Sequence, residues 1–140
     1  MKKYLPLVIC AIIALNSCKT KQSISEPAKE EAVTMLPQIS ILEAYLQKEI
    51  GGQENEPTTE YLHLKFKPVE AKGVIFEKIS TQAKEVSIIK SSNNLKLDVT
   101  QLSIKISNPE TYPTIFYSKN NQNGSQKIEA ILLKEPLYRP

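Results

Sequence analysis

The stretch YLHLKFK, residues 61–67, decides the fold class of this chain. Apolar and polar side chains alternate along it, with Leu62, Leu64 and Phe66 on one side and His63, Lys65 and Lys67 on the other. This period of two is typical of a β-strand with one face buried and one face in water. The stretch therefore predicts a strand that lies over a hydrophobic core.

Similar stretches follow at short intervals. GVIFEKI (73–79) and EVSIIK (85–90) are rich in β-branched residues and precede the turn cluster 91–94. LKLDVTQLSIKIS (95–107) alternates but slips phase near Gln101, which predicts a bulge or a short loop between two strands. TIFYSK (114–119) and KIEAILLK (127–134) flank a polar loop, in which Asn123-Gly124 predicts a hairpin turn.

Short strands at intervals of about 8–12 residues predict an antiparallel sandwich or barrel. No long helical pattern lies between them, which argues against alternating strands and helices. The sequence therefore predicts one all-β domain over residues 39–140. We expect an immunoglobulin-like antiparallel β-sandwich of about seven short strands.

Residues 38–50, QISILEAYLQKEI, fit two structures. Apolar residues near helical spacing favour a helix: Ile39, Leu42, Leu46 and Ile50. A strand would instead place Ile39, Ile41, Glu43 and Tyr45 on one side and Leu42, Ala44 and Leu46 on the other. Gly51-Gly52 ends the element in both cases.

The first residues have the architecture of an export signal. Lys2 and Lys3 precede an apolar run, residues 5–15, interrupted only by Pro6. A run of 11 residues is too short to cross a bilayer as a helix. The sequence therefore predicts a signal peptide over residues 1–17, with cleavage between Ser17 and Cys18.

The tetrad Leu15-Asn16-Ser17-Cys18 resembles the lipobox of bacterial lipoproteins. The resemblance implies that the thiol of Cys18 carries a diacylglyceryl group and that its new amino group is acylated. Several acyl chains on one residue would anchor the protein firmly, because each buried methylene contributes about 0.8 kcal/mol. Cys10 lies in the segment expected to be removed, so we expect no free thiol in the mature chain.

Residues 18–38 comprise the lipidated cysteine and a polar stretch, which we expect to be a flexible tether. Lys19 stands where an aspartate would indicate inner-membrane retention in the enterobacterial pattern, so we expect the bacterial outer membrane. The sequence favours neither the periplasmic nor the external face of that membrane. Signal removal takes away Lys2 and Lys3 and leaves 16 basic against 15 acidic residues, which gives no support to nucleic-acid binding.

Several segments together resemble a set of small lipoproteins from flavobacteria. They are AYLQKEIGG (44–52), the strand ending at Phe66, KGVIFEKI (72–79), KEVSIIK (84–90) and the closing EPLYRP. These lipoproteins share a lipobox, a polar spacer and a Pro-x-Tyr-x-Pro-like end. The resemblance covers most of the mature chain and implies an all-β fold. It implies no activity and no catalytic residues.

The residues that could carry catalysis are few. His63 is the only histidine, and we expect it to be exposed beside Lys65. A general base needs an orienting partner and a nucleophile, and a zinc site needs further ligands. We therefore expect no catalytic residue, no metal and no cofactor.

Two further groups are candidate binding sites. Glu54, Glu56 and Glu60 cluster in residues 51–60, a candidate ligand loop, although a solvated loop is the simpler interpretation. Phe116 would point outward if its neighbours in the strand point inward. Phe116 and Tyr112 would then form an exposed apolar surface of the kind that marks interfaces.

These features predict a non-enzymatic interaction module that is anchored in the membrane by its lipid. Its expected partner is another envelope protein, docked by strand addition to a sheet edge. A glycan-binding or weakly hydrolytic sandwich, using the loop 51–60 and nearby tyrosines, is the alternative.

Overall fold

A computed structural model describes residues 35–140 of the chain. The predicted signal peptide, Ser17, Cys18 and the tether as far as residue 34 lie outside the described residues. Residues 36–38, predicted to belong to the tether, pack on the domain. The amide of Leu36 donates to the carbonyl of Asn123 at 3.1 Å, and the hydroxyl of Tyr117 donates to the carbonyl of Pro37 at 3.0 Å.

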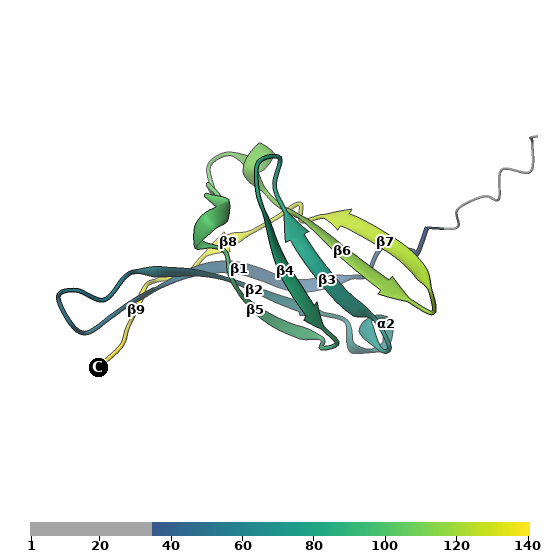
Figure 1. The fold of residues 1–140 in the computed structure, drawn as a ribbon, viewed down its shortest axis with the longest axis horizontal. Helices are drawn as coiled ribbons and strands as arrows, with labels where there is room; N and C mark the ends of the chain where they lie inside the picture. The colour runs from purple at the N-terminus through teal and green to yellow at the C-terminus, as the bar shows by residue number, and fades with distance from the viewer. Residues whose placement is uncertain (1–34) are drawn as a thin grey trace, which may run out of the picture. The chain divides into compact units, whose positions relative to one another are not determined.

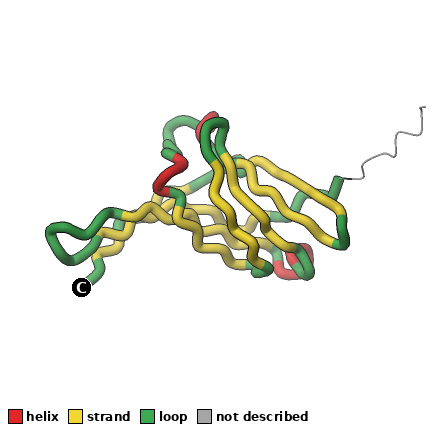
Figure 2. The backbone as a smooth tube through the Cα atoms, in the orientation of Figure 1, coloured by secondary structure: helices red, strands yellow, loops and turns green. Residues whose placement is uncertain are grey.

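Two sheets pack face to face, as Figures 1 and 2 show. The first sheet has the order β5-β2-β1-β8, with β9 also paired to β1. Its strands are β1 (Ile41–Ile50), β2 (Thr59–Phe66), β5 (Asn94–Asp98), β8 (Leu132–Leu133) and β9 (Leu137–Tyr138). The second sheet, in the order β4-β3-β6-β7, contains β3 (Ile75–Ser80), β4 (Glu85–Lys90), β6 (Thr114–Lys119) and β7 (Gln122–Lys127).

The strand pairing confirms the predicted all-β sandwich. Neighbouring strands are antiparallel, except that β8 and β9 run parallel to β1. The chain crosses between the sheets after β2, β4, β5 and β7, and the hairpins β3–β4 and β6–β7 stay within the second sheet. This order, with β1, β2 and β5 facing β4, β3, β6 and β7, is that of an immunoglobulin-like sandwich.

The helices of the described part are short. They are α2 (Pro68–Ala71) and two 3₁₀ turns, Thr100–Leu102 and Pro109–Thr111. The second half of the run 95–107 is not a strand: β5 ends at Asp98 and the first 3₁₀ turn follows. The phase slip near Gln101 therefore marks this turn, while Leu102 and Ile104 remain buried and explain the apolar pattern.

The core forms between the inner faces of the two sheets. Leu62, Leu64 and Phe66 of β2 are at most 2% exposed, which confirms the alternation predicted for residues 61–67. Phe66 stacks on Phe76 of β3 with ring centroids 4.5 Å apart. Phe76 in turn meets the edge of Tyr117 of β6 at 6.2 Å. Three aromatic rings thus connect the sheets across the core.

Residues 41–50 form a strand and not a helix. Ala44 and Leu46 point into the core, while Leu42 is 57% exposed. The register against β2 shifts between Ile41 and Glu43, and this irregularity changes the phase of the apolar pattern. The helix-like spacing of Ile39, Leu42, Leu46 and Ile50 therefore does not mark one buried face, because Leu42 is exposed in the strand.

The predicted turn at Asn123-Gly124 is wrong by three residues. The β6–β7 hairpin turns at Asn120 and Asn121, whose φ angles of 51° and 62° are left-handed. Asparagine tolerates this conformation, which two-residue hairpin turns require. Gly124 instead lies inside β7, where a Cβ atom would overlap the ring of Tyr117. Of the predicted strand 127–134, only Lys127, which ends β7, and Leu132–Leu133 are in strands.

The segment before β1 is fastened by buried side chains. Gln126 of β7 accepts a hydrogen bond from the amide of Ile39 at 2.7 Å and donates one to its carbonyl at 2.8 Å. Glu70 of α2 accepts from the amide of Ser40 at 2.7 Å. This bond and the nearby Lys67 lower the pKa of Glu70 to about 2. The two side chains therefore attach residues 39–40 to β7 of the second sheet and to α2.

Ile89 adopts a conformation that costs stability. It lies at an irregularity of the β3–β4 ladder with a φ angle of 47°, and its side chain is 75% exposed. A β-branched residue in the left-handed region is strained by about 1–3 kcal/mol, whereas asparagine tolerates that region.

We expect Ile89→Asn to raise the free energy of unfolding by about 1 kcal/mol, because strain is relieved and little apolar burial is lost. Urea unfolding of the two proteins measures this difference. The matched variant Ile75→Asn, at a 46% exposed isoleucine of β3 without positive φ, should lower stability instead. A lower stability of Ile89→Asn would contradict the strain.

Candidate functional site

The exposed apolar residues of the described domain concentrate along one edge of the first sheet. Four lie on β8 and β9 and define the C-terminal edge: Leu132, Leu133, Leu137 and Tyr138, at 67%, 64%, 50% and 75% exposure. Leu42 of the neighbouring β1 adds to them. Contiguous apolar residues in water are unusual on a monomer and mark sites that bind other molecules.

The C-terminal edge consists of two very short strands. β8 pairs with β1 at Tyr45 and Leu46, and β9 pairs with β1 at Glu49 and Ile50. Figure 1 shows both strands running beside β1 on the outer side of the sheet. Their remaining side faces water, and an open strand edge is a ready template for pairing with another chain.

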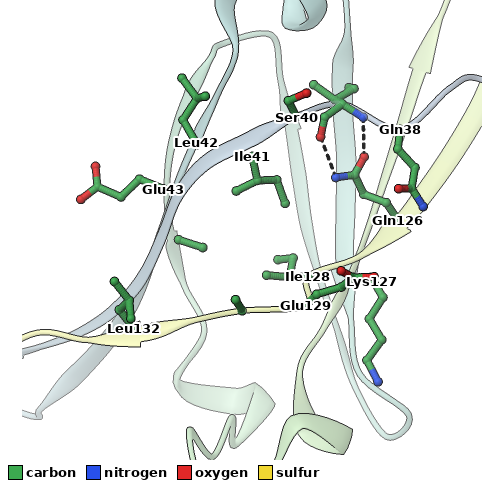
Figure 3. A pocket seen from close by; sticks show the side chains of 13 residues that line it. Gln38, Ser40, Ile41, Leu42, Glu43, Gln126, Lys127, Ile128, Glu129 and Leu132 are labelled. Carbon is green, nitrogen blue, oxygen red and sulfur yellow. Dashed lines mark hydrogen bonds between the residues drawn. The ribbon is translucent and has the colours of Figure 1, made fainter.

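A hollow of about 550 Å³ opens beside this edge. Its walls are the start of β1 and the segment that leads from β7 to β8, as Figure 3 shows. The apolar part of the lining comes from seven residues: Ile39, Ile41, Leu42, Ala44, Ile128, Ala130 and Leu132. Because Leu132 also belongs to the C-terminal edge, the hollow and the edge form one continuous surface.

Polar side chains hold the C-terminal segment on β1. Lys134 pairs with Glu43 at 3.1 Å, and its ammonium lies 3.6 Å from the centroid of the Tyr45 ring. The amide of Gln47 donates to the carbonyl of Glu135 at 2.9 Å. Backbone amides of Lys134 and Arg139 donate to carbonyls of β1. These contacts leave the leucines of the segment facing water.

Glu49 is the centre of a charge cluster on the outer face of the first sheet. Its carboxylate pairs with Lys96 of β5 and with Arg139 beyond β9. Hydrogen bonds from Lys96, and then from Arg139, hold the pKa of Glu49 below its ordinary value. A carboxylate that stays ionised between two cations is no general acid, so the cluster fastens three segments together.

His63 lies on the same face, stacked on Tyr45 with ring centroids 4.4 Å apart. Its Nε2 atom is buried without a hydrogen-bond partner. Burial lowers the pKa of His63 below its ordinary value of 6.5, and the charge of Lys96 lowers it further. The histidine that we expected to be exposed is thus partly buried and favours its neutral form.

Below about pH 6.5 the unfolded chain therefore binds a proton at His63 more readily than the folded chain. Folding stability should fall as the pH decreases through this range. We expect His63→Phe to reduce this loss, and to raise stability at pH 7.5 because Nε2 is no longer buried without a partner. Urea unfolding at pH 7.5 and 5.5 provides the measurement.

His63→Gln is the matched control, because it removes the titration but keeps a polar group. It should reduce the pH dependence without the gain at pH 7.5. An equal loss of stability between the two pH values in all three proteins would contradict the assignment to His63.

The glutamates of the candidate ligand loop do not gather into a site. Glu54 and Glu56 are exposed in the connection between β1 and β2, and Glu60 lies in β2 opposite Lys48. None of the three lines the hollow beside β1. In residues 35–140, no group of three or more histidine, cysteine or acidic side chains is placed to hold a metal ion.

Tyr112 and Phe116 do not form the expected exposed pair. Tyr112 is only 8% exposed, and its hydroxyl donates to the carbonyl of Ile106 at 2.8 Å. A tyrosine before this strand that bonds a few residues upstream is the tyrosine corner of immunoglobulin-like sandwiches. Phe116 does point outward between inward-facing Ile115 and Tyr117, but it is half-buried beneath Lys78. Tyr112 thus belongs to the core.

No family model, no curated protein and no solved structure matches the chain. The longest α-helix in residues 35–140 has four residues, so no helix of this part could cross a membrane.

Proposed function

We propose that this protein is a non-enzymatic interaction module that docks against another protein of the bacterial envelope. The docking surface is the C-terminal edge together with the hollow beside it. The observation that carries the proposal is the concentration of exposed leucines on an open strand edge. A strand of the partner would satisfy the backbone groups of this edge, and its apolar side chains would cover the leucines.

The predicted lipid anchor would place the domain close to its partner. Acylation of Cys18 would hold the domain at the outer membrane, and residues 19–34 would let it reach a partner in the same membrane. Tethering raises the local concentration of the domain near such a partner, so a small docking surface suffices for stable association.

Affinity purification tests the proposal. A tag placed after Pro140 through a flexible linker allows capture from membranes solubilised in mild detergent, with Cys18→Ala as the control. We expect one stoichiometric protein partner with the wild-type chain and much less of it with Cys18→Ala. A protein recovered alone under both conditions would contradict the proposal and favour a screen for glycan binding.

A further inference from the structure

The first residues of β1 lack a strand on one side. Ile41, Glu43 and Ala44 pair with β2, but β8 joins β1 only from Tyr45 onward. Leu42 has no cross-strand partner in either ladder, because the register against β2 shifts around it. In the described domain, this part of β1 is therefore a strand edge that adjoins the hollow.

The hollow lies at the open side of the sandwich, between the start of β1, which β8 does not reach, and β7, the edge strand of the second sheet. Core residues reach its wall: Ile39, Ala44 and Ile128 are 5%, 8% and 1% exposed. Ala44 and Ala130, which have small side chains, line the hollow from its two walls. Figure 3 shows Ile41 and Ile128 on these walls. A volume of about 550 Å³ is in the range of small-molecule binding pockets, which is ample for one aliphatic side chain.

These features together determine the chemistry of an occupant. A strand edge offers alternating amide donors and carbonyl acceptors, which an extended polypeptide satisfies along its whole length. An apolar wall favours aliphatic side chains, because their burial removes apolar surface from water. An extended apolar segment meets both requirements at once.

We propose that the hollow accepts an extended segment of the partner protein, which adds to β1 along Ile41–Ala44. One aliphatic side chain of that segment enters between Ala44 and Ala130. This inference rests on the proposed function and names the partner's contribution: a short β-strand with an aliphatic residue facing the domain. The hollow is continuous with the C-terminal edge through Leu132, so one partner can cover both.

A synthetic probe tests the acceptor site without the partner. The probe is the peptide Ac-Lys-Val-Lys-Val-Lys-Val-NH₂, which can form a strand with one aliphatic face. A second peptide, N-methylated at every residue, cannot donate a backbone hydrogen bond from either edge. Binding is followed by amide chemical shifts of the full chain in mild detergent. The shifts should concentrate at 41–44 and 128–130 and be weaker with the methylated peptide.

Ala130→Trp should fill the hollow from an exposed position and weaken peptide binding at least about tenfold. Ala83→Trp, in the exposed β3–β4 turn, is the matched control and should bind like the wild type. Equal melting temperatures would show that both variants fold. Absence of shifts at 41–44, or equal binding by Ala130→Trp or by the methylated peptide, would overturn the acceptor site. The peptide experiment contains no partner protein. A negative result would therefore overturn the acceptor site alone, and the affinity purification would still test docking through the C-terminal edge.

Discussion

Gln126→Ala is expected to lower the free energy of unfolding by about 3 kcal/mol. The amide side chain of Gln126 is 8% exposed and bonds both the amide and the carbonyl of Ile39, which is itself 5% exposed. Removing it leaves two buried backbone groups without partners, and each such group costs about 1–3 kcal/mol. A loss of this size is a large fraction of the stability of a small domain.

Urea unfolding of the full chain measures this effect, and two variants define its origin. Gln126→Met keeps most of the volume but neither hydrogen bond, so it should be destabilised nearly as much as Gln126→Ala. Gln122→Ala, at an exposed position of the same strand, should stay within about 0.5 kcal/mol of the wild type. Wild-type stability of Gln126→Met would show that Gln126 contributes by packing and not by its two hydrogen bonds to Ile39.

The double variant Leu133→Lys/Leu137→Lys is expected to reduce capture of the partner at least about tenfold. The two leucines are 64% and 50% exposed, so lysine at these positions should leave the fold intact. Lysine on a strand edge opposes pairing with another chain, because its ammonium would lose water on docking. Quantitative mass spectrometry of the affinity-purified samples gives the ratio of partner to tagged protein.

Val69→Lys is the matched control for this loss. Val69 is 79% exposed and lies on α2, apart from the C-terminal edge in the sequence and in the fold. Its substitution should leave the captured amount of partner unchanged. Equal capture by the double variant, or an equal loss with Val69→Lys, would show that the partner does not depend on this edge.

The fold class could be predicted because strand alternation is a local property of the sequence. β2 shows this most clearly, since every second residue of YLHLKF faces the core. The turn of the second hairpin could not be placed, because Asn120-Asn121 and Asn123-Gly124 are both good turn sequences. Contact between Gly124 and the ring of Tyr117 decides between them, and this contact depends on the pairing of β6 with β7.

The candidate site was harder to predict than the fold. In the sequence, EPLYRP resembles a tail that ends the domain, and Leu132-Leu133 resembles part of a regular strand. Their exposure follows from pairing with β1, which lies about 90 residues earlier, as the contact of Arg139 with Glu49 shows. The pattern that could have indicated this edge is two apolar pairs, Leu132-Leu133 and Leu137-Tyr138, separated by Lys-Glu-Pro. Such a segment is too short and too interrupted for a core strand.

Site-specific photo-crosslinking tests the central claim, docking through the C-terminal edge, most directly. A photoreactive amino acid is placed at Leu133 in one protein and at Val69 in another, and membranes containing each full chain are irradiated before solubilisation. We predict a defined crosslinked protein from position 133 and none from position 69. A crosslink at position 69 alone, equal products at both positions, or none at position 133 would contradict docking through this edge.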